Sequence, residues 1–167
     1  MVSLQTDRLQ LEEITFEDAD FIIALLNTPS WIQYIGDRNV HTIKEANSYI
    51  QRSYIHAYKK YGFGMYKMVL KSNDKTIGLC GLVKRNYLKH HDIGFALLPD
   101  YHRQGYAYEA ASAIMNHAHQ TLHIHPILAF TTQNNLASQN LLQKLGLQFK
   151  KFIKIPNDEE ILMLFSN

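Results

Sequence analysis

Apolar and polar residues alternate along several short stretches of the chain, a pattern that is typical of β-strands. In the clearest of these stretches, Asp92–Leu98, the apolar residues Ile93, Phe95 and Leu97 occupy every second position. Pro99 follows and ends the strand, because proline cannot donate a hydrogen bond to a neighbouring strand. The same pattern predicts further strands at residues 8–13, 65–70, 76–84, 127–132, 147–155 and 161–165. Turn residues at 72–74 and 156–158 predict two hairpins among them.

Between these strands, apolar residues recur at three- or four-residue spacing, which predicts helices with one buried face. The helices are expected from Thr15 to Pro29, from Thr42 to Tyr61, at Ala107–Leu122 and at Asn135–Leu145. Pro29 breaks the first helix. Thr42 and Glu45 have the spacing of a capping box and open the second. Gly146 fits the C-terminal cap of the last helix.

The predicted order of elements is β, α, α, β, β, β, α, β, α, β, β. This order indicates an α/β fold (α+β) in which helices cover the faces of a mixed sheet. A chain of 167 residues can bury a core, and no linker or repeat divides it. We therefore expect residues 1–167 to form a single domain.

Composition narrows the class of protein. Hydrophobic residues make up 46% of the chain and charged residues 19%, which fits a folded domain and not a disordered segment. The net charge of +2, with no basic run, argues against a nucleic-acid partner. There is no long apolar run or signal-peptide pattern, so we expect no membrane partner and a soluble, cytoplasmic protein. The single cysteine, Cys80, fits a reducing compartment and is interpreted as a buried thiol, not a nucleophile.

The loop between the strand at Asp92–Leu98 and the next helix has the composition of an anion site. The first N–H groups of a helix have no partner within the helix, and the helix dipole favours an anion there. Arg103, Gln104 and Gly105 offer successive backbone donors, one cation and no Cβ at the point of closest approach. This loop is therefore a candidate phosphate or pyrophosphate cradle. The alternative is an ordinary turn whose glycine serves backbone geometry alone.

Other short motifs accompany this loop. Near the start of the chain is Thr6-Asp7-Arg8-Leu9-Gln10-Leu11, and further on are Asn135-x-x-Ser138 and Lys144-Leu145-Gly146-Leu147. With His102–Ala107 in the position of a Gln/Arg-x-x-Gly-x-Gly/Ala signature, this ordered set resembles the GNAT N-acetyltransferase superfamily. The branch it resembles most contains the ribosomal-protein N-terminal acetyltransferases (RimJ/RimL-like). His102 departs from the family pattern, as do Leu147 in place of Phe and Leu142 in place of a catalytic Tyr.

The resemblance implies a GNAT-like fold whose two central strands splay apart, with acetyl-CoA as the cosubstrate. The pyrophosphate of acetyl-CoA would bind the loop, and its pantetheine arm would lie in the gap and bond to strand backbone. Asn135 would contact the same arm, although it could instead be a plain helix-start residue. The expected cofactor-binding residues are Phe95, Ala96, Leu97, Arg103, Gln104, Gly105, Tyr106, Ala107 and Asn135.

For catalysis we expect the amine to attack the thioester directly, in one complex with acetyl-CoA. A backbone N–H of the central strand would stabilise the oxyanion. Asp92 is the candidate general base, with Glu160 as its rival and a solvated strand-end carboxylate as the structural alternative. Ser138 could return a proton to the departing CoA thiolate, because Leu142 has no hydroxyl. Its alternative role is a first-turn serine that bonds to backbone.

The acceptor is the least defined part of the prediction. A protein or peptide α-amino group is favoured, because its pKa is near ~8 whereas that of lysine is near ~10.4. A small amine, such as a polyamine or an aminoglycoside, and a non-catalytic acyl-CoA-binding module are the alternatives. The aromatic residues expected to line the acceptor pocket are Trp31, Tyr34, Tyr61 and Phe63. A homodimer is compatible with the sequence.

No metal site is predicted. His117, His119, His123 and His125 cluster in the sequence, and His119 and His123 would share a helix face at i, i+4. However, His117 points elsewhere and no cysteine lies near, so a closed set of four ligands is missing.

Overall fold

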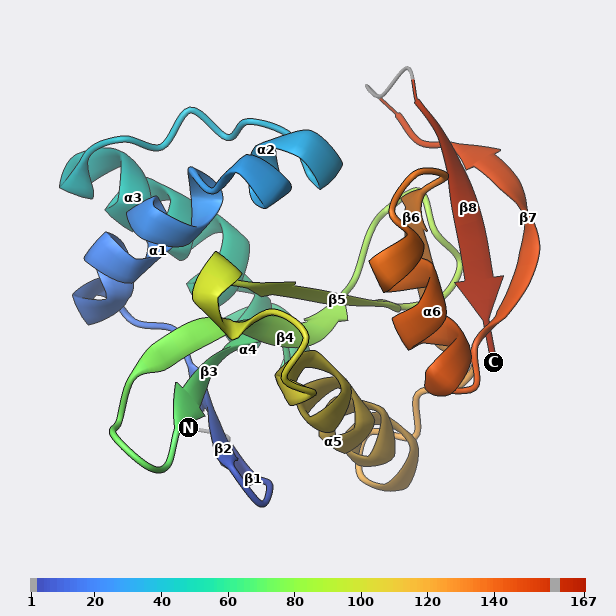
Figure 1. Ribbon diagram of the computed structural model, residues 1–167, viewed down its shortest axis with the longest axis horizontal. Helices are drawn as coiled ribbons and strands as arrows, with labels where there is room; N and C mark the ends of the chain where they lie inside the picture. Colours follow the sequence, from blue (N-terminus) through green and yellow to red (C-terminus); the bar gives the residue numbers. More distant parts are fainter. Residues whose placement is uncertain (1–2, 157–159) are drawn as a thin grey trace.

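The computed structural model describes residues 3–156 and 160–167. Its described strands form one eight-stranded mixed sheet in the order β1-β2-β3-β4-β5-β6-β8-β7 (Figure 1). The strands are β1 (Ser3–Gln5), β2 (Leu9–Glu13), β3 (Met65–Leu70), β4 (Thr76–Val83), β5 (Asp92–Leu97), β6 (Leu128–Thr132), β7 (Gln148–Lys154) and β8 (Ile161–Ser166).

The described helices are α1 (Ala19–Leu26), α2 (Pro29–Tyr34), α3 (Ile43–Ile50), α4 (His56–Tyr61), α5 (Tyr106–Gln120) and α6 (Leu136–Lys144). A π-helical segment, Gln51–Ile55, joins α3 to α4, so that residues 43–61 form one helical run. The predicted capping box at its start is confirmed, because the Thr42 side chain accepts from Glu45 N and the Glu45 side chain accepts from Thr42 N. None of the helices in the described parts of the chain has both the length and the apolar character needed to cross a bilayer.

Two hydrophobic cores cover the two faces of the sheet. On one face α5 packs against β2 to β5, and buried residues such as Leu11, Cys80 and Ile114 belong to this core. On the other face α1 and α3 form the second core, in which Ile22 and Ile50 are fully buried. The helices α1 to α3 accordingly lie apart from α5 in the fold (Figure 1).

The sheet is nearly interrupted between β5 and β6. These parallel strands pair only at Asp92 and Leu128 among the described residues, whereas β5 pairs with β4 along its whole length. Beyond that point the two strands diverge toward their carboxyl ends (Figure 1). The predicted mixed α/β fold with splayed central strands is confirmed.

The structure also differs from the sequence prediction in places. The short strand β1 was not expected, because three residues are too few to show a period. Pro29 follows the end of α1 but begins α2, where the missing N–H of proline costs nothing and Thr28 caps the helix. The helix α5 ends at Gln120, before Leu122, so His123 lies beyond it and does not share a helix face with His119. Of the predicted turn at 156–158, residues 157 and 158 lie outside the described residues.

Candidate active site

The loop that joins β5 to α5 has the backbone shape of an anion cradle. After a 3-10 turn at Pro99–Tyr101, Arg103 and Gly105 adopt the left-handed conformation, with φ of 59° and 84°. Gly105 is the N-cap of α5 and supplies no side chain to bond the first N–H groups of this 15-residue helix. Those donors are therefore directed at the space in front of the helix, where an anion is favoured.

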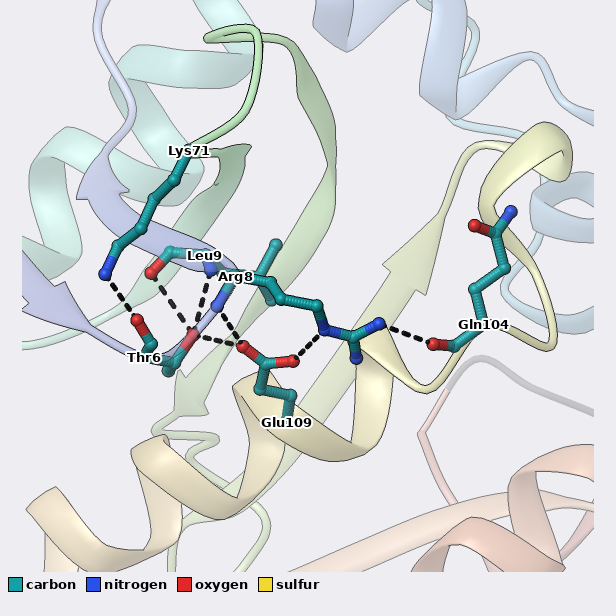
Figure 2. A network of polar contacts seen from close by, with 6 residues as sticks. All are labelled: Thr6, Arg8, Leu9, Lys71, Gln104 and Glu109. Carbon is teal, nitrogen blue, oxygen red and sulfur yellow. Dashed lines mark hydrogen bonds and ion pairs between the residues drawn. The ribbon is translucent and has the colours of Figure 1, made fainter.

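Arg8, which immediately precedes β2, fixes this loop from the side. Its Nε lies 2.7 Å from Glu109 Oε2 on α5, and its Nη1 donates to the Gln104 carbonyl at 3.0 Å (Figure 2). Its guanidinium carbon lies 4.4 Å from the centroid of the Tyr106 ring. A Cβ at Gly105 would lie 3.3 Å from Arg8 Nη2, so a side chain at this position would crowd the guanidinium.

Glu109, the partner of Arg8 in this ion pair, is held as an anion. Its Oε1 accepts from Thr6 Oγ1 at 2.6 Å and from Arg8 N at 2.8 Å (Figure 2). Burial raises the pKa of the carboxyl, but the hydrogen bonds from Thr6 and Arg8 outweigh burial and hold the pKa below its usual value. The roles of Arg8 and Glu109 were missed in the sequence analysis. The Thr6–Leu11 motif was the one signal that pointed to Arg8, and it gave no partner.

The neighbouring side chains of the loop also have definite places. Gln104 Nε2 donates to the Asp100 carbonyl at 2.8 Å, and Arg103 is exposed. His102, the departure from the family signature, lies with Nε2 3.0 Å from the Leu97 carbonyl at the end of β5. Because a carbonyl only accepts, Nε2 carries the proton in this contact. Backbone donors in the loop do not depend on the identity of residue 102.

The backbone of β5 alternates between its two neighbours. Leu98 N donates to Ile77 O on the β4 side at 2.9 Å, so the N–H and C=O groups of Ala96 also face β4. The backbone groups of Phe95 and Leu97 consequently face the gap between β5 and β6. Of the predicted strand contacts, Phe95 and Leu97 present backbone to the gap, whereas Ala96 packs its side chain near the second core.

Asp92 lies at the closed end of this gap, where β5 meets β6. It is 2% exposed, and both of its carboxylate oxygens accept from Arg85 Nε, at 3.0 and 3.2 Å. Burial raises the pKa of Asp92, and the opposing effect of Arg85 does not fully cancel that rise. The Arg85 guanidinium carbon also lies 4.8 Å from the centroid of the Phe130 ring on β6. The pair therefore spans the junction between the two strands.

Asn135 and Ser138 lie beyond the opposite end of β6, at the start of α6. Asn135 is the N-cap of α6, and its Oδ1 accepts from Ser138 N at 3.1 Å. The structural alternative for Asn135 is thus realised, while its Nδ2 donors are not needed for the cap. Ser138 is half-buried in the first turn. The structure therefore brings Asn135 and Ser138 together, but sets both at the other end of β6 from Asp92.

The structure places the residues that depart from the family pattern, and the other candidates for a catalytic or metal-binding role, either in the core or on the surface. Leu142 and Leu147 are each 1% exposed and belong to the core beneath α5. Cys80 is fully buried in the same core, and burial raises the pKa of its thiol. Glu160 is exposed immediately before β8. His119 and His125 lie with their ring centroids 5.2 Å apart, and no group of three or more possible metal ligands occurs within residues 3–156 and 160–167.

A cavity of about 430 Å³ opens beside the closed end of the gap. Tyr61 and Phe63, two of the aromatic residues expected around the acceptor, line it together with Arg85. Trp31 is buried in the second core instead, and Tyr34 is not among the lining residues.

Comparison with known proteins identifies the family. Residues 8–148 match the family described as "Acetyltransferase (GNAT) domain". A curated relative from Bacillus subtilis (strain 168), "Uncharacterized N-acetyltransferase YoaA", is 32% identical over 147 residues, which cover 87% of this chain and 82% of that protein. The chain therefore belongs to the GNAT acetyltransferase family. It is an N-acetyltransferase.

Solved structures of this fold include proteins with different acceptors. One is the RimL ribosomal L7/L12 α-N-protein acetyltransferase in complex with coenzyme A, with a TM-score of 0.83 and 16% identity over 99% of this chain and 97% of that chain. Another is a spermidine N-acetyltransferase SpeG chimera from Vibrio cholerae and hSSAT, with a TM-score of 0.77 and 15% identity over 96% of this chain and 95% of that chain. At these identities the likeness concerns the fold, so the acceptor has to be argued from the residues of this chain.

Proposed function

We propose that this N-acetyltransferase takes its acetyl group from acetyl-CoA and transfers it directly to the α-amino group of a peptide or protein N-terminus. The observation that carries the proposal is the arrangement along β5. A phosphate-type cradle follows the carboxyl end of this strand, and a buried carboxylate begins it. Between them runs a backbone edge that has no strand partner beyond Asp92 among the described residues.

The residues at the cradle fit the pyrophosphate of acetyl-CoA. The start of α5 has no side-chain cap, Gly105 leaves the approach open, and Arg103 provides an exposed cation. The backbone from Arg103 to Ala107, which includes Gln104 and Tyr106, would hold the phosphates. When bound, acetyl-CoA supplies an acetyl group that is activated as a thioester.

The gap between β5 and β6 fits the pantetheine arm. Phe95 and Leu97 would bond to it through backbone, as a neighbouring strand would, while Ala96 would contact it through its side chain. Asn135 would donate from Nδ2 across the gap. The Phe95 N–H, which faces the gap, is the candidate donor to the oxyanion that forms during transfer.

Asp92 and Ser138 would move the protons. A carboxylate whose pKa is raised by burial is a better base than an exposed one, and Arg85 keeps it oriented by bonding to both of its oxygens. Asp92 would take the proton of the incoming amine, directly or through water. Ser138 would donate its hydroxyl proton toward the departing thiolate from the far side of the gap and regain a proton from water.

The α-amino acceptor is supported by how little help its deprotonation needs from a base. An α-amino group, with a pKa near ~8, loses its proton far more easily at neutral pH than a lysine side chain with a pKa near ~10.4. Release of free CoA thiol would be measured with free peptide N-termini, N-terminally blocked lysine peptides, polyamines and aminoglycosides. We expect free N-termini to give the highest kcat/KM. Faster turnover with polyamines or lysine side chains would contradict the proposed acceptor.

A further inference from the structure

The cavity beside Asp92 has walls from separate segments of the chain. The helical run through the π-helical segment and α4 forms one wall, with Arg52, His56 and Lys60 at four-residue spacing. The end of β4 and the residues after it, including Lys84 and Arg85, form another. These side chains therefore come from the helical run and from the segment after β4, whereas the phosphate cradle lies in the loop before α5.

The cavity borders the closed end of the β5–β6 gap through Arg85. Arg85 lines the cavity and donates to Asp92. Met65 also lines it, and a Cβ placed on Gly94 of β5 would lie 3.7 Å from Met65 Sδ. An acceptor that presents its amine to Asp92 would therefore have the rest of its body in this cavity.

The charge of the lining is strongly one-sided. No Asp or Glu is among the lining residues, while Arg52, Lys60, Lys84 and Arg85 are cations. The charge of Arg85 is balanced by Asp92, but Arg52, Lys60 and Lys84 have no carboxylate oxygen within 4.0 Å among the described residues. Lys84 Nζ instead donates to the Lys89 carbonyl at 3.3 Å.

The surroundings of His91 are consistent with this positive region. Its ring lies edge-on to that of Phe63, another lining residue, with 5.2 Å between the centroids. Burial lowers the pKa of His91, and the charges of Lys84 and His90 lower it further. A cation in the cavity would meet the same repulsion, whereas an anion would be attracted.

We propose that the acceptor carries carboxylate groups close to its amine, as a peptide with acidic side chains after its first residue does. The inference rests on the proposed function, because it names the acceptor class of the same site. Polyamines, whose bodies are cationic, are disfavoured on the same ground.

The test compares peptides that share a first serine and differ at the next two positions: Asp-Glu, Asn-Gln or Lys-Arg. Exposed charge pairs have modest effects, so we expect kcat/KM to fall roughly two- to fivefold for each acidic residue replaced by its amide, and further for the basic peptide. The preference should shrink as ionic strength rises from about 0.01 M to about 1 M, because salt screens charges in contact with solvent. Equal kcat/KM for the acidic and neutral peptides would overturn the inference.

Variants of the lining locate the effect. Lys60→Gln and Lys84→Gln should each raise KM for the acidic peptide more than KM for the neutral peptide. Lys59→Gln is the matched control, since Lys59 is an exposed neighbour on α4 that does not line the cavity. An equal effect of the Lys59 and Lys60 changes would show that net charge, and not the cavity, sets the preference.

Two further measurements separate this inference from the proposed function. Free aspartate and glutamate are included as acceptors. If they outcompete the acidic peptide, the preference for carboxylates stands, but the acceptor is a small amino acid and not a peptide. Binding of each peptide to the CoA complex is also measured by thermal shift, without turnover. If the acidic peptide binds no better than the neutral one, the inference fails even where N-termini are acetylated. If it binds better but no N-terminus is acetylated, only the proposed reaction fails.

Discussion

Arg8 and Glu109 are 101 positions apart in the sequence, yet Arg8 N donates to Glu109 Oε1 at 2.8 Å and Arg8 Nε to Glu109 Oε2 at 2.7 Å. The same arginine bonds to the Gln104 carbonyl inside the cradle. The segment before β2 is thereby tied to the first turns of α5 and to the loop that precedes it. Arg8 is a positioning residue for the cradle, because it sets the shape of backbone that would contact phosphate.

Replacing Arg8 should consequently weaken CoA binding while the fold survives. Hydrogen bonds to charged groups contribute about 1.5–3 kcal/mol, and less where solvent reaches them, as it does at the half-exposed Arg8. We expect Arg8→Gln to raise the Kd for CoA about tenfold, measured by calorimetry. Arg38→Gln removes an exposed arginine that bonds to the Ile35 carbonyl, and it should leave the Kd unchanged. An unchanged Kd in Arg8→Gln would remove this residue from the cofactor site.

Gly105→Glu should abolish the stabilisation that CoA gives the protein. The substitution adds bulk beside Arg8 and a negative charge where the pyrophosphate would approach, at a backbone φ of 84°. Gly36→Glu is the control, since Gly36 has a φ of 97° and open space around its Cβ position. Thermal unfolding with and without CoA reports the difference. If both folded variants keep the wild-type shift, this loop does not bind the cofactor.

Asp92→Asn should lower turnover by roughly 10²-fold at neutral pH, within the usual range for losing a general base. In the wild type, turnover should fall as pH decreases through the raised pKa of Asp92, because the protonated carboxyl cannot accept another proton. In the variant this dependence should be absent, and the loss should shrink at high pH, where the acceptor deprotonates unaided. CoA binding should persist. A wild-type pH–rate profile in Asp92→Asn, with a large loss in Glu160→Gln, would transfer the role to Glu160.

Ser138→Ala should reduce turnover less than Asp92→Asn does. Free thiols have a pKa near ~8.5, so a CoA thiolate leaves tolerably well without a proton donor. Because the Asn135 cap bonds to the Ser138 N–H and not to its hydroxyl, the variant should keep the start of α6 intact. Single-turnover kinetics with CoA and peptide saturating isolates the chemical step. A loss larger than that of Asp92→Asn would contradict this order and make protonation of the thiolate the more demanding proton transfer.

The sequence predicted those structural features whose signal is local. The alternation that ends at Pro99 and the glycine before a helix are read from neighbouring residues, so β5 and the start of α5 could be predicted with nearly correct bounds. The capping box at Thr42 is equally local. Contacts across the fold leave no such periodic signal. The Arg8–Glu109 pair and the partnership of Asp92 with Arg85 therefore emerged only from the structure.

The cavity beside Asp92 shows the same limit more strongly. Its lining comes from a helical run, the start of β3 and the end of β4, and its charge is apparent only when those segments are assembled. The net charge of +2 gave no sign of it. Of the aromatic residues expected around the acceptor, Tyr61 and Phe63 line this cavity. Trp31 lies in the second core instead. Burial of its large apolar indole there contributes more stabilising free energy than lining a polar cavity would.

Because β5 pairs with β6 only at Asp92 and Leu128 among the described residues, alternate backbone amides of β5 differ in their access to water. The amides of Gly94 and Ala96 are directed to β4, while those of Phe95 and Leu97 face the gap and have no strand partner among the described residues. In deuterated water the first pair should exchange slowly and the second quickly. A pantetheine arm that bonds to this edge would slow the exchange of the Phe95 and Leu97 amides alone. The difference in exchange rate between alternate residues of β5 would then disappear when the cofactor binds. Uniform slowing along β5 would instead indicate general tightening of the fold.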